Sequence, residues 1–190
     1  MALEPDPRPL IGEPLALDLL NTEKVADGAP FDLFATADGL ARWLDAVGID
    51  APDDEVVRRS LVEARAAIRG VVTSGSAALQ RERERERERE RVNGVLAHGR
   101  VAVAIDHDNT VTRSVDVSAD AWRPAVLAVM SLVELLETAP DRIRRCDHPN
   151  CVLWFLDTTR NGTRRWCSMA GCGNRAKAQR HYERTRSRHA

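Results

Sequence analysis

The sequence CDHPNC at residues 146–151 is followed, after fifteen residues, by CSMAGC at residues 167–172. The two segments have the same spacing between their cysteines, and the 145 residues before Cys146 contain no cysteine. Two loops that each present two thiolates can close a tetrahedral site around one zinc ion. The bound ion would also stabilise a module of about 50 residues, which is too small to be held together by its own core. The expected ligands are Cys146, Cys151, Cys167 and Cys172.

Four thiolates leave no open coordination position, so the spacing predicts one structural Zn2+ ion and not a hydrolytic metal. A redox pair or two disulfides would use the same cysteines. The sequence shows neither a secretory signal nor a membrane span, which favours a reducing, cytoplasmic location and therefore zinc. His148 and His181 are substitute ligands if one cysteine does not bind. An enzyme is the least favoured class, since there is no phosphate loop and no nucleophile elbow.

Charge is distributed unevenly along the chain. Residues 142–190 hold eleven Arg and one Lys against two Asp and one Glu, a net charge of +9. Because the whole chain carries a formal charge of −1, the preceding 141 residues carry −10. One end of the molecule is therefore expected to attract polyanions and the other to repel them.

The segment between the two cysteine pairs predicts a β-hairpin. Residues 153–156 are apolar, residues 165–166 lead into the second pair, and Asn161-Gly162 is a dipeptide favoured in tight turns. The aromatic side chains of this segment are able to stack on bases, but in so small a module we expect them to form the hydrophobic core. They are Trp154, Phe155 and Trp166.

The segment after Cys172 combines strong helix formers with almost no apolar stripe. A helix that is polar on every side must face solvent or a polar partner. Its basic residues recur at steps of three and four, so one face could approach phosphates or enter a major groove. Their single sign favours a nucleic-acid partner over plain solvation. The expected DNA contacts are Arg160, Arg164, Arg165, Asn174, Arg175, Lys177, Arg180, His181 and Arg184.

The N-terminal part is expected to be mainly helical. The residues up to Glu13 are rich in proline and acid and predict a partly ordered arm. Residues 15–20, LALDLL, fit a buried strand or a helical turn, and the strand is the preferred prediction. Apolar periodicity predicts a helix over residues 36–47, stopped by Gly48, and a second helix that starts near residue 52 and ends within residues 70–75.

The middle of the chain carries three further signals. Residues 81–91 alternate Arg and Glu strictly, which predicts a solvated helix or linker in preference to a surface for a charged partner. Residues 101–105 and 110–117 flank a turn-forming sequence that contains His107, and they predict a hairpin. A long apolar helix is expected from about residue 120 until Pro140 stops it.

The sequence around the second cysteine pair resembles a known family. CGNR at residues 172–175, RRWCSM at 164–169 and FLD at 155–157 are similar to the bacterial CGNR zinc finger. LALDLLNT at 15–22 and LARWL at 40–44 resemble the ABATE domain that precedes this finger. The resemblance implies a stress-induced transcription regulator whose four cysteines bind zinc. It implies DNA binding only through the same basic residues, so it adds no separate support for that activity.

We therefore expect an α+β protein with two parts. Residues 1–138 would form an ABATE-like domain, mainly helical with a short hairpin, and residues 139–190 a zinc finger built from a β-hairpin and a helix. The expected function is DNA-binding transcription regulation. The alternative is a zinc-stabilised protein–protein adaptor that makes no direct contact with DNA.

DNA, contacted mainly through its phosphates, is the principal expected partner, and no membrane contact is expected. A small-molecule effector and a homodimer are further partners that the sequence leaves open. If the N-terminal domain binds an effector, Asp18, Asn21 and Trp43 are the candidate pocket residues, although each is more often a cap or core residue.

Overall fold

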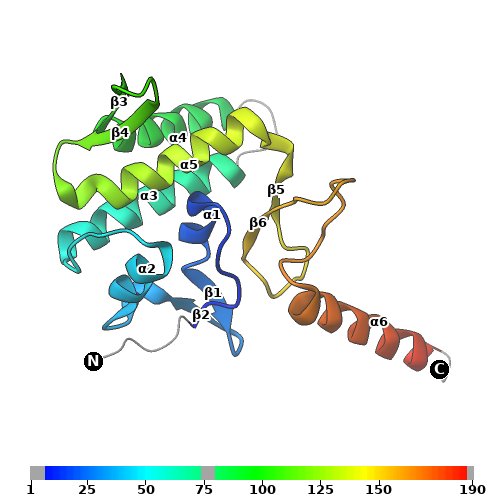
Figure 1. Ribbon diagram of the computed structural model, residues 1–190. Coiled ribbons are helices and arrows are strands. Elements are labelled where there is room, and N and C mark those ends of the chain that lie inside the picture. Colours follow the sequence, from blue (N-terminus) through cyan, green and yellow to red (C-terminus); the bar gives the residue numbers. More distant parts are fainter. Residues whose placement is uncertain (1–6, 74–79, 188–190) are drawn as a thin grey trace.

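Helices form most of the N-terminal part, and a small sheet with one projecting helix forms the C-terminal part (Figure 1). The computed structural model describes residues 7–73 and 80–187. The architecture is α+β, as predicted, with antiparallel two-stranded sheets. The N-terminal elements are α1 (Leu15–Leu20), β1 (Glu23–Ala26), β2 (Ala29–Asp32), α2 (Gly39–Val47), α3 (Glu55–Thr73), α4 (Gln80–Leu96), β3 (Gly99–Ile105), β4 (Val111–Val117) and α5 (Arg123–Thr138). The C-terminal elements are β5 (Ile143–Arg145), β6 (Trp154–Leu156) and α6 (Asn174–Ser187).

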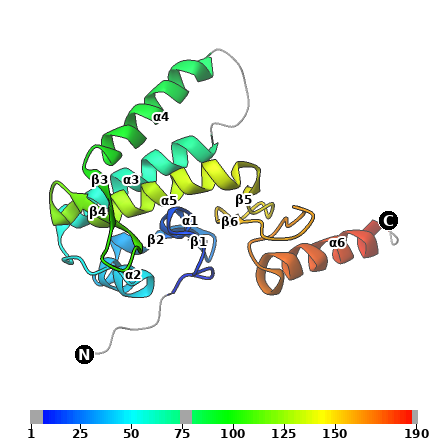
Figure 2. The same cartoon turned by 45° about the horizontal axis from the view of Figure 1, so that its top comes forward.

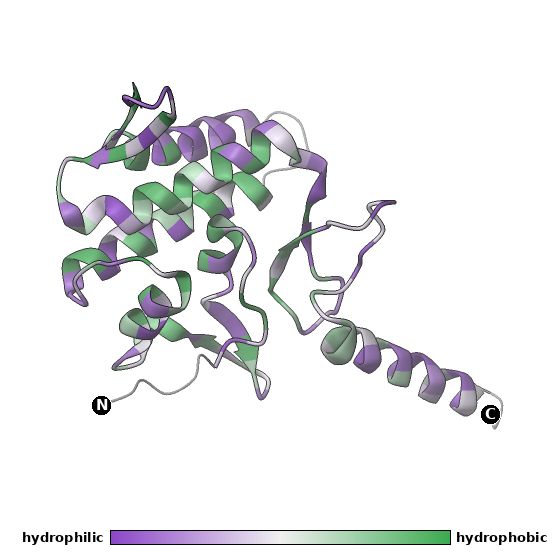
Figure 3. Ribbon diagram, in the orientation of Figure 1, coloured by the Kyte–Doolittle hydropathy of each residue, from purple (hydrophilic) through white to green (hydrophobic). Residues whose placement is uncertain are grey.

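Helices α1, α3 and α5 pack against one another and enclose the main hydrophobic core. The second predicted helix is present as α3, and its apolar stripe is fully buried, from Val57 to Ile68. Helix α5 buries Val126 and Val129 as expected, and its hydrophobic residues stand out along its length in Figure 3. Among the described helices, α5 included, none has the length and apolarity that a membrane span requires.

The prediction of a strand at residues 15–20 is wrong, because this segment is helix α1. A six-residue apolar run fits a strand and a buried helical turn equally well, so periodicity cannot distinguish them. The tertiary contacts decide here. Asp18 in the middle of α1 is buried and accepts hydrogen bonds from Arg8 and from Trp43 Nε1. The arm is thus anchored from Arg8 onward, while residues 1–6 lie outside the described part of the chain.

The loop expected after α1 contains a hairpin that sequence analysis missed. Strands β1 and β2 pair through a tight turn at Asp27-Gly28, where both residues have positive φ angles of 50° and 81°. This is the Asp-Gly signal for a two-residue turn. Helix α2 ends as predicted at Gly48, which has a φ of 67°. Helix α3 ends at Thr73, within the predicted stretch, although residues 74 and 75 lie outside the described part.

The Arg/Glu repeat forms the exposed helix α4, so the prediction of a solvated helix is confirmed. Opposite charges three residues apart pair, as in Arg91 with Glu88 at 3.1 Å. The hairpin predicted next is present as β3 and β4, with His107 exposed at its tip. Helix α5 then begins at Arg123 and ends before Pro140.

The C-terminal sheet pairs different strands from those we expected. Strand β6 includes most of the predicted run, but it pairs with β5, which precedes Cys146, and residues 165–166 are not a strand. Gly162 still occupies a turn with a φ of 63°. Pairing with β5 brings Cys146 opposite Leu153, since the Cys146 amide donates to the Leu153 carbonyl at 2.9 Å.

Alternate side chains of β6 point to opposite faces, as a strand requires. Trp154 and Leu156 pack against the main core of the N-terminal part. Leu153 and Phe155 pack with the four cysteines in a second, smaller cluster. The run is therefore apolar throughout because both of its faces are buried.

The outer edge of β6 has its backbone groups bonded by side chains. The backbone groups of Leu153 and Asp157 bond residues that flank β5, which are Cys146 and Arg142. Because backbone groups alternate between the two edges of a strand, those of Trp154 and Leu156 point to the other edge. There the side chain of Asn21 donates from Nδ2 to the Trp154 carbonyl and accepts at Oδ1 from the Trp154 backbone amide, both at 2.9 Å. Glu13 Oε2 accepts from the Leu156 amide at 2.9 Å. We call these contacts the edge clasp.

Replacing Asn21 by alanine should destabilise the protein by about 3 kcal/mol, because two buried backbone groups of Trp154 would lose their partner, at about 1–3 kcal/mol each. Urea unfolding of the zinc-loaded protein measures this loss. Asn93→Ala on the exposed face of α4 is the matched control and should change stability by less than about 0.5 kcal/mol. Equal stabilities of the two variants would contradict the role given to the clasp.

Candidate metal centre and basic helix

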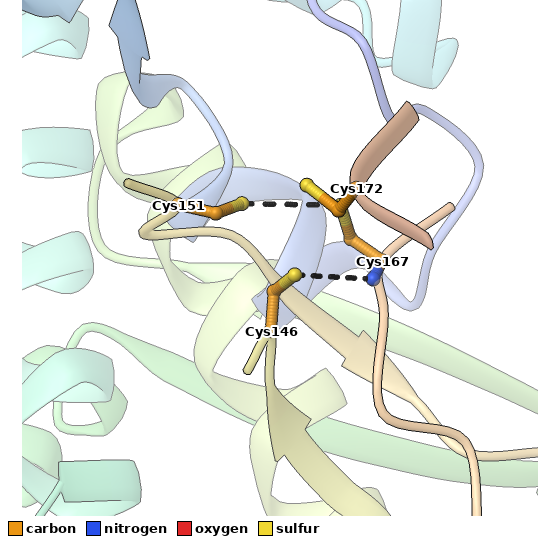
Figure 4. A group of neighbouring side chains, drawn as sticks. All are labelled: Cys146, Cys151, Cys167 and Cys172. Atoms are coloured by element: carbon orange, nitrogen blue, oxygen red, sulfur yellow. Dashed lines mark hydrogen bonds between the residues drawn. The ribbon is translucent and has the colours of Figure 1, made fainter. Parts of the chain in front are cut away.

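Four cysteine sulfurs converge in the C-terminal part. Cys146 directly follows β5, Cys151 and Cys167 lie in loops, and Cys172 lies in a π-helical turn over Met169–Gly173. All four are buried, and their sulfurs lie within 4.8 Å of one another (Figure 4). The structure therefore brings together all of the residues predicted to bind zinc.

The spacing of the sulfurs suits a tetrahedral zinc ion. A Zn–S bond of about 2.3 Å places the sulfurs of a regular tetrahedron about 3.8 Å apart. Cys151 and Cys167 have their sulfurs 3.9 Å apart, and those of Cys167 and Cys172 are 3.6 Å apart. The donor set and its size fit one ion with four thiolate ligands.

Without a cation the cluster holds few negative charges. A hydrogen bond from Cys167 lowers the pKa of the Cys151 thiol to about 5, and donation of the same bond raises the pKa of Cys167. Burial raises the pKa of Cys146. Cys146 and Cys167 therefore favour the protonated form without a metal, and four thiolates together need a positive charge between them.

Donors outside the cysteine side chains also point at the sulfurs. The Cys167 amide donates to Cys146 Sγ at 3.4 Å, and the Arg175 guanidinium donates to Cys172 Sγ at 3.0 Å. Donation of this hydrogen bond to Cys172 raises the pKa of Arg175 further. Such contacts orient ligands and balance their charge.

Neither histidine that we considered as a substitute ligand belongs to the cluster in the described part of the chain. His148 is buried, and its Nδ1 accepts a hydrogen bond from the Asn150 amide at 3.2 Å within the first cysteine loop. His181 is exposed on α6.

Two of the three aromatic side chains belong to the core of the finger, as expected, because Phe155 lies in the cysteine cluster and Trp166 packs against it. Phe155 is fully buried in the cysteine cluster, whereas Trp154 inserts into the N-terminal core and not into the core of the finger. Trp166 is half-buried and has the Arg165 guanidinium 5.1 Å from its ring centre.

Arg164 holds the C-terminal part together. Its guanidinium lies 4.2 Å above the ring of Phe155 and donates to the carbonyls of Trp166 at 3.1 Å and Cys167 at 2.6 Å. It also donates to the Leu156 carbonyl at 3.3 Å and lies 3.6 Å from Glu13. One side chain therefore links β6, the second cysteine loop and the N-terminal arm.

The other residues predicted to contact DNA are exposed, and some of them have protein partners. Arg165 pairs with Asp147 at 2.7 Å, and the Asn174 amide donates to the Ala170 carbonyl at 3.3 Å. Helix α6 projects away from the body in both Figure 1 and Figure 2. Arg175, also exposed, bonds the Cys172 sulfur. The remaining exposed residues of this group are Arg160 in the loop and Lys177, Arg180, His181 and Arg184 on α6.

The candidate pocket residues of the N-terminal part are all buried. Asp18 accepts from Trp43 Nε1 at 3.0 Å, and Asn21 is bonded to Trp154 in the edge clasp. Asp18 lines a groove beside α5, whereas Asn21 and Trp43 are not among its lining residues. Sequence analysis missed Arg8 and Glu13. Arg8 bonds Asp18 in the short buried helix α1, and the partners of Glu13, Leu156 and Arg164, lie far away along the chain.

Comparison with protein families adds two matches. A sequence model of the CGNR zinc finger matches residues 142–185. A model of ABATE, described as "Putative stress-induced transcription regulator", matches residues 13–139. No curated relative matches the chain.

Replacing Arg164 by alanine should lower the free energy of unfolding by about 3 kcal/mol, because hydrogen bonds to a charged group contribute roughly 1.5–3 kcal/mol and several carbonyls would lose their donor. Arg160→Ala removes the same charge from an exposed loop position and should cost less than about 0.5 kcal/mol. Urea unfolding of both variants provides the comparison. The structural role assigned to Arg164 would be wrong if both variants were as stable as the unmodified protein.

Proposed function

This chain belongs to the ABATE family and ends in a CGNR zinc finger, and from this premise we propose that it regulates transcription by binding DNA through α6. The family matches make it a regulatory zinc-finger protein, and both describe families other than enzymes. The observation that carries the DNA-binding proposal is the exposed, basic helix α6, attached directly to the cysteine cluster.

We assign the four cysteines as the ligands of one structural zinc ion. Cys146, Cys151, Cys167 and Cys172 are buried, close together and of the donor type that zinc prefers. All four positions would be taken by protein, so the ion supplies folding free energy and no hydrolytic chemistry. The proposed boundary between the regulatory part, residues 1–138, and the finger, residues 139–190, falls where Pro140 follows α5.

The zinc site would fix the direction of α6. The helix follows the π-helical turn that contains Cys172, and Arg175 in its first turn bonds the Cys172 sulfur. Metal binding therefore holds both the start of the helix and its axis. This arrangement supports a helix presented rigidly to a partner.

Net charge favours a polyanion as that partner. Helix α6 holds four Arg and one Lys against one Glu. Phosphate contacts would dominate the affinity and carry no sequence information. We propose Lys177, Arg180, His181 and Arg184 as the main contacts, with Arg160 and Arg165 nearby, while Arg164 and Arg175 shape the finger.

The adaptor alternative has one observation in its favour, since Tyr182 on α6 is 69 % exposed and apolar contacts suit a protein partner. Deleting residues 1–138 would not separate the two functions. Trp154 packs into the N-terminal core, so the isolated finger would expose it. Full-length variants are therefore required.

The purified protein should contain one zinc ion per chain by mass spectrometry, and Cys172→Ser should lose it, whereas Thr163→Ser should keep it. Zinc binding at about pH 7 should release at least two protons, because Cys146 and Cys167 have raised pKa values and stay protonated without metal. Calorimetry in buffers of different ionisation enthalpy measures this proton release. Zinc affinity should consequently rise with pH, which titrations at several pH values measure. A metal-free protein that retains its fold would contradict the assignment.

Duplex DNA binding should weaken steeply with salt. If about five phosphates are neutralised, log affinity falls with log salt at a slope near −4.5. Lys177→Ala/Arg180→Ala/Arg184→Ala should bring the slope to about −1.8, since each lost contact changes it by about 0.9.

The matched control is Arg83→Ala/Arg85→Ala/Arg87→Ala on α4, which removes the same charge and should leave the slope unchanged. Fluorescence anisotropy at several salt concentrations measures both variants. Salt-insensitive binding, or equal slopes for the two triple variants, would favour the adaptor.

A further inference from the structure

A groove of about 840 Å³ lies beside α5 in the N-terminal part. The N-terminal arm, α1, the end of α2 with the residues after it, the last residue of α4 and the start of β3 complete its walls. Its volume falls in the range of about 300–1,000 Å³ that is usual for small-molecule sites.

The walls of the groove are mainly apolar. Helix α5 is hydrophobic on two faces: one enters the core, and the other contributes Leu127, Met130 and Val133 to the groove. Leu15, Val47 and Ile49 face them from the other elements. A ligand with an apolar body would bury the parts of these side chains that the core leaves accessible.

The charge of the groove is negative. Its described lining residues include Glu13, Glu134 and Glu137 and no Lys, Arg or His. Glu134 and Glu137 are exposed and form no ion pair with any described side chain. Asp18 is already paired with Arg8, so it contributes less to the field.

We propose that this groove binds a small organic cation with an apolar body and that its occupancy is communicated to the zinc finger through Glu13. The apolar walls would take the body of the ligand, and the glutamates would take its charge. An anion of the same shape would be repelled by the exposed carboxylates of Glu134 and Glu137 and would bind more weakly.

Glu13 provides the physical link because it belongs to two sites at once. It lines the groove, and it also accepts from the Leu156 amide and pairs with Arg164 in the finger. A cation near Glu13 would compete with the Arg164 guanidinium for the carboxylate of Glu13. Binding would therefore alter the edge clasp, and by linkage the finger would alter ligand affinity.

Tetraphenylphosphonium and tetraphenylborate test the site, because they have the same shape and opposite charges. Calorimetry on the full-length, zinc-loaded protein should show the cation binding once per chain and the anion binding at least about tenfold more weakly. Glu134→Gln/Glu137→Gln should weaken cation binding by about four- to twenty-fivefold, since each exposed ion pair contributes a factor of roughly two to five. The control Glu63→Gln/Glu90→Gln removes two exposed charges elsewhere and should leave the affinity unchanged.

Val133→Trp should fill the groove and abolish binding while the thermal unfolding temperature is kept. If that variant does not fold, the comparison of Glu134→Gln/Glu137→Gln with Glu63→Gln/Glu90→Gln still tests whether the cation binds in this groove. Equal affinities for the two ions, or no binding of the cation, would overturn the proposed ligand class.

Amide exchange measured by NMR tests the link to the finger. A saturating concentration of the cation should change the exchange rate of the Leu156 amide at least about threefold. The Phe155 backbone amide faces β5, so its exchange rate should stay unchanged. An unchanged Leu156 rate would overturn the coupling.

The regulatory consequence rests on the proposed DNA-binding function, and it predicts an altered DNA affinity when the cation is bound. Unaltered affinity in a protein that binds both DNA and the cation would overturn the effector role. Calorimetry and exchange require no DNA, so failure of DNA binding and failure of the groove are distinguishable.

Discussion

The outer edge of β6 is the place where the two parts of this protein become one structure. A strand edge without a partner strand leaves backbone groups that must be bonded if they are buried. Asn21 and Glu13, from the N-terminal part, bond those groups, and Trp154 on the same strand enters the N-terminal core. The finger is therefore attached by a polar edge and an apolar anchor at the same point.

The cysteine cluster imposes the second constraint. It buries Phe155 and Leu153 on the opposite face of the same strand, so β6 is shared between two cores. Two arginines bond groups within the finger: Arg164 donates to backbone carbonyls, and Arg175 donates to the Cys172 sulfur. The basic residues further along α6 remain exposed to solvent.

Several elements follow from local sequence signals. The apolar periodicity of α2 and α3, the Gly48 stop and the turn between β3 and β4 were all predictable, because neighbouring residues determine them. Helix α1 and the β5–β6 pairing were predicted wrongly. A segment of six residues, five of them apolar, is too short to specify a period. The tight turn expected at Asn161-Gly162 suggested that β6 pairs with the segment after it, whereas β6 pairs with β5, which precedes it. The β1–β2 hairpin was missed although Asp27-Gly28 signals it.

The sequence by itself determined the zinc-finger character, the four clustered cysteines and the basic helix, because ligand type, spacing and charge are properties of a short stretch of chain. Only the tertiary structure decided that Trp154 belongs to the N-terminal core, that Glu13 and Asn21 bond β6, and that Arg164 is a structural residue. These contacts join residues more than 130 positions apart in the clasp, and no local pattern encodes such a distance. The same holds for the groove beside α5, whose walls come from segments that meet only after folding.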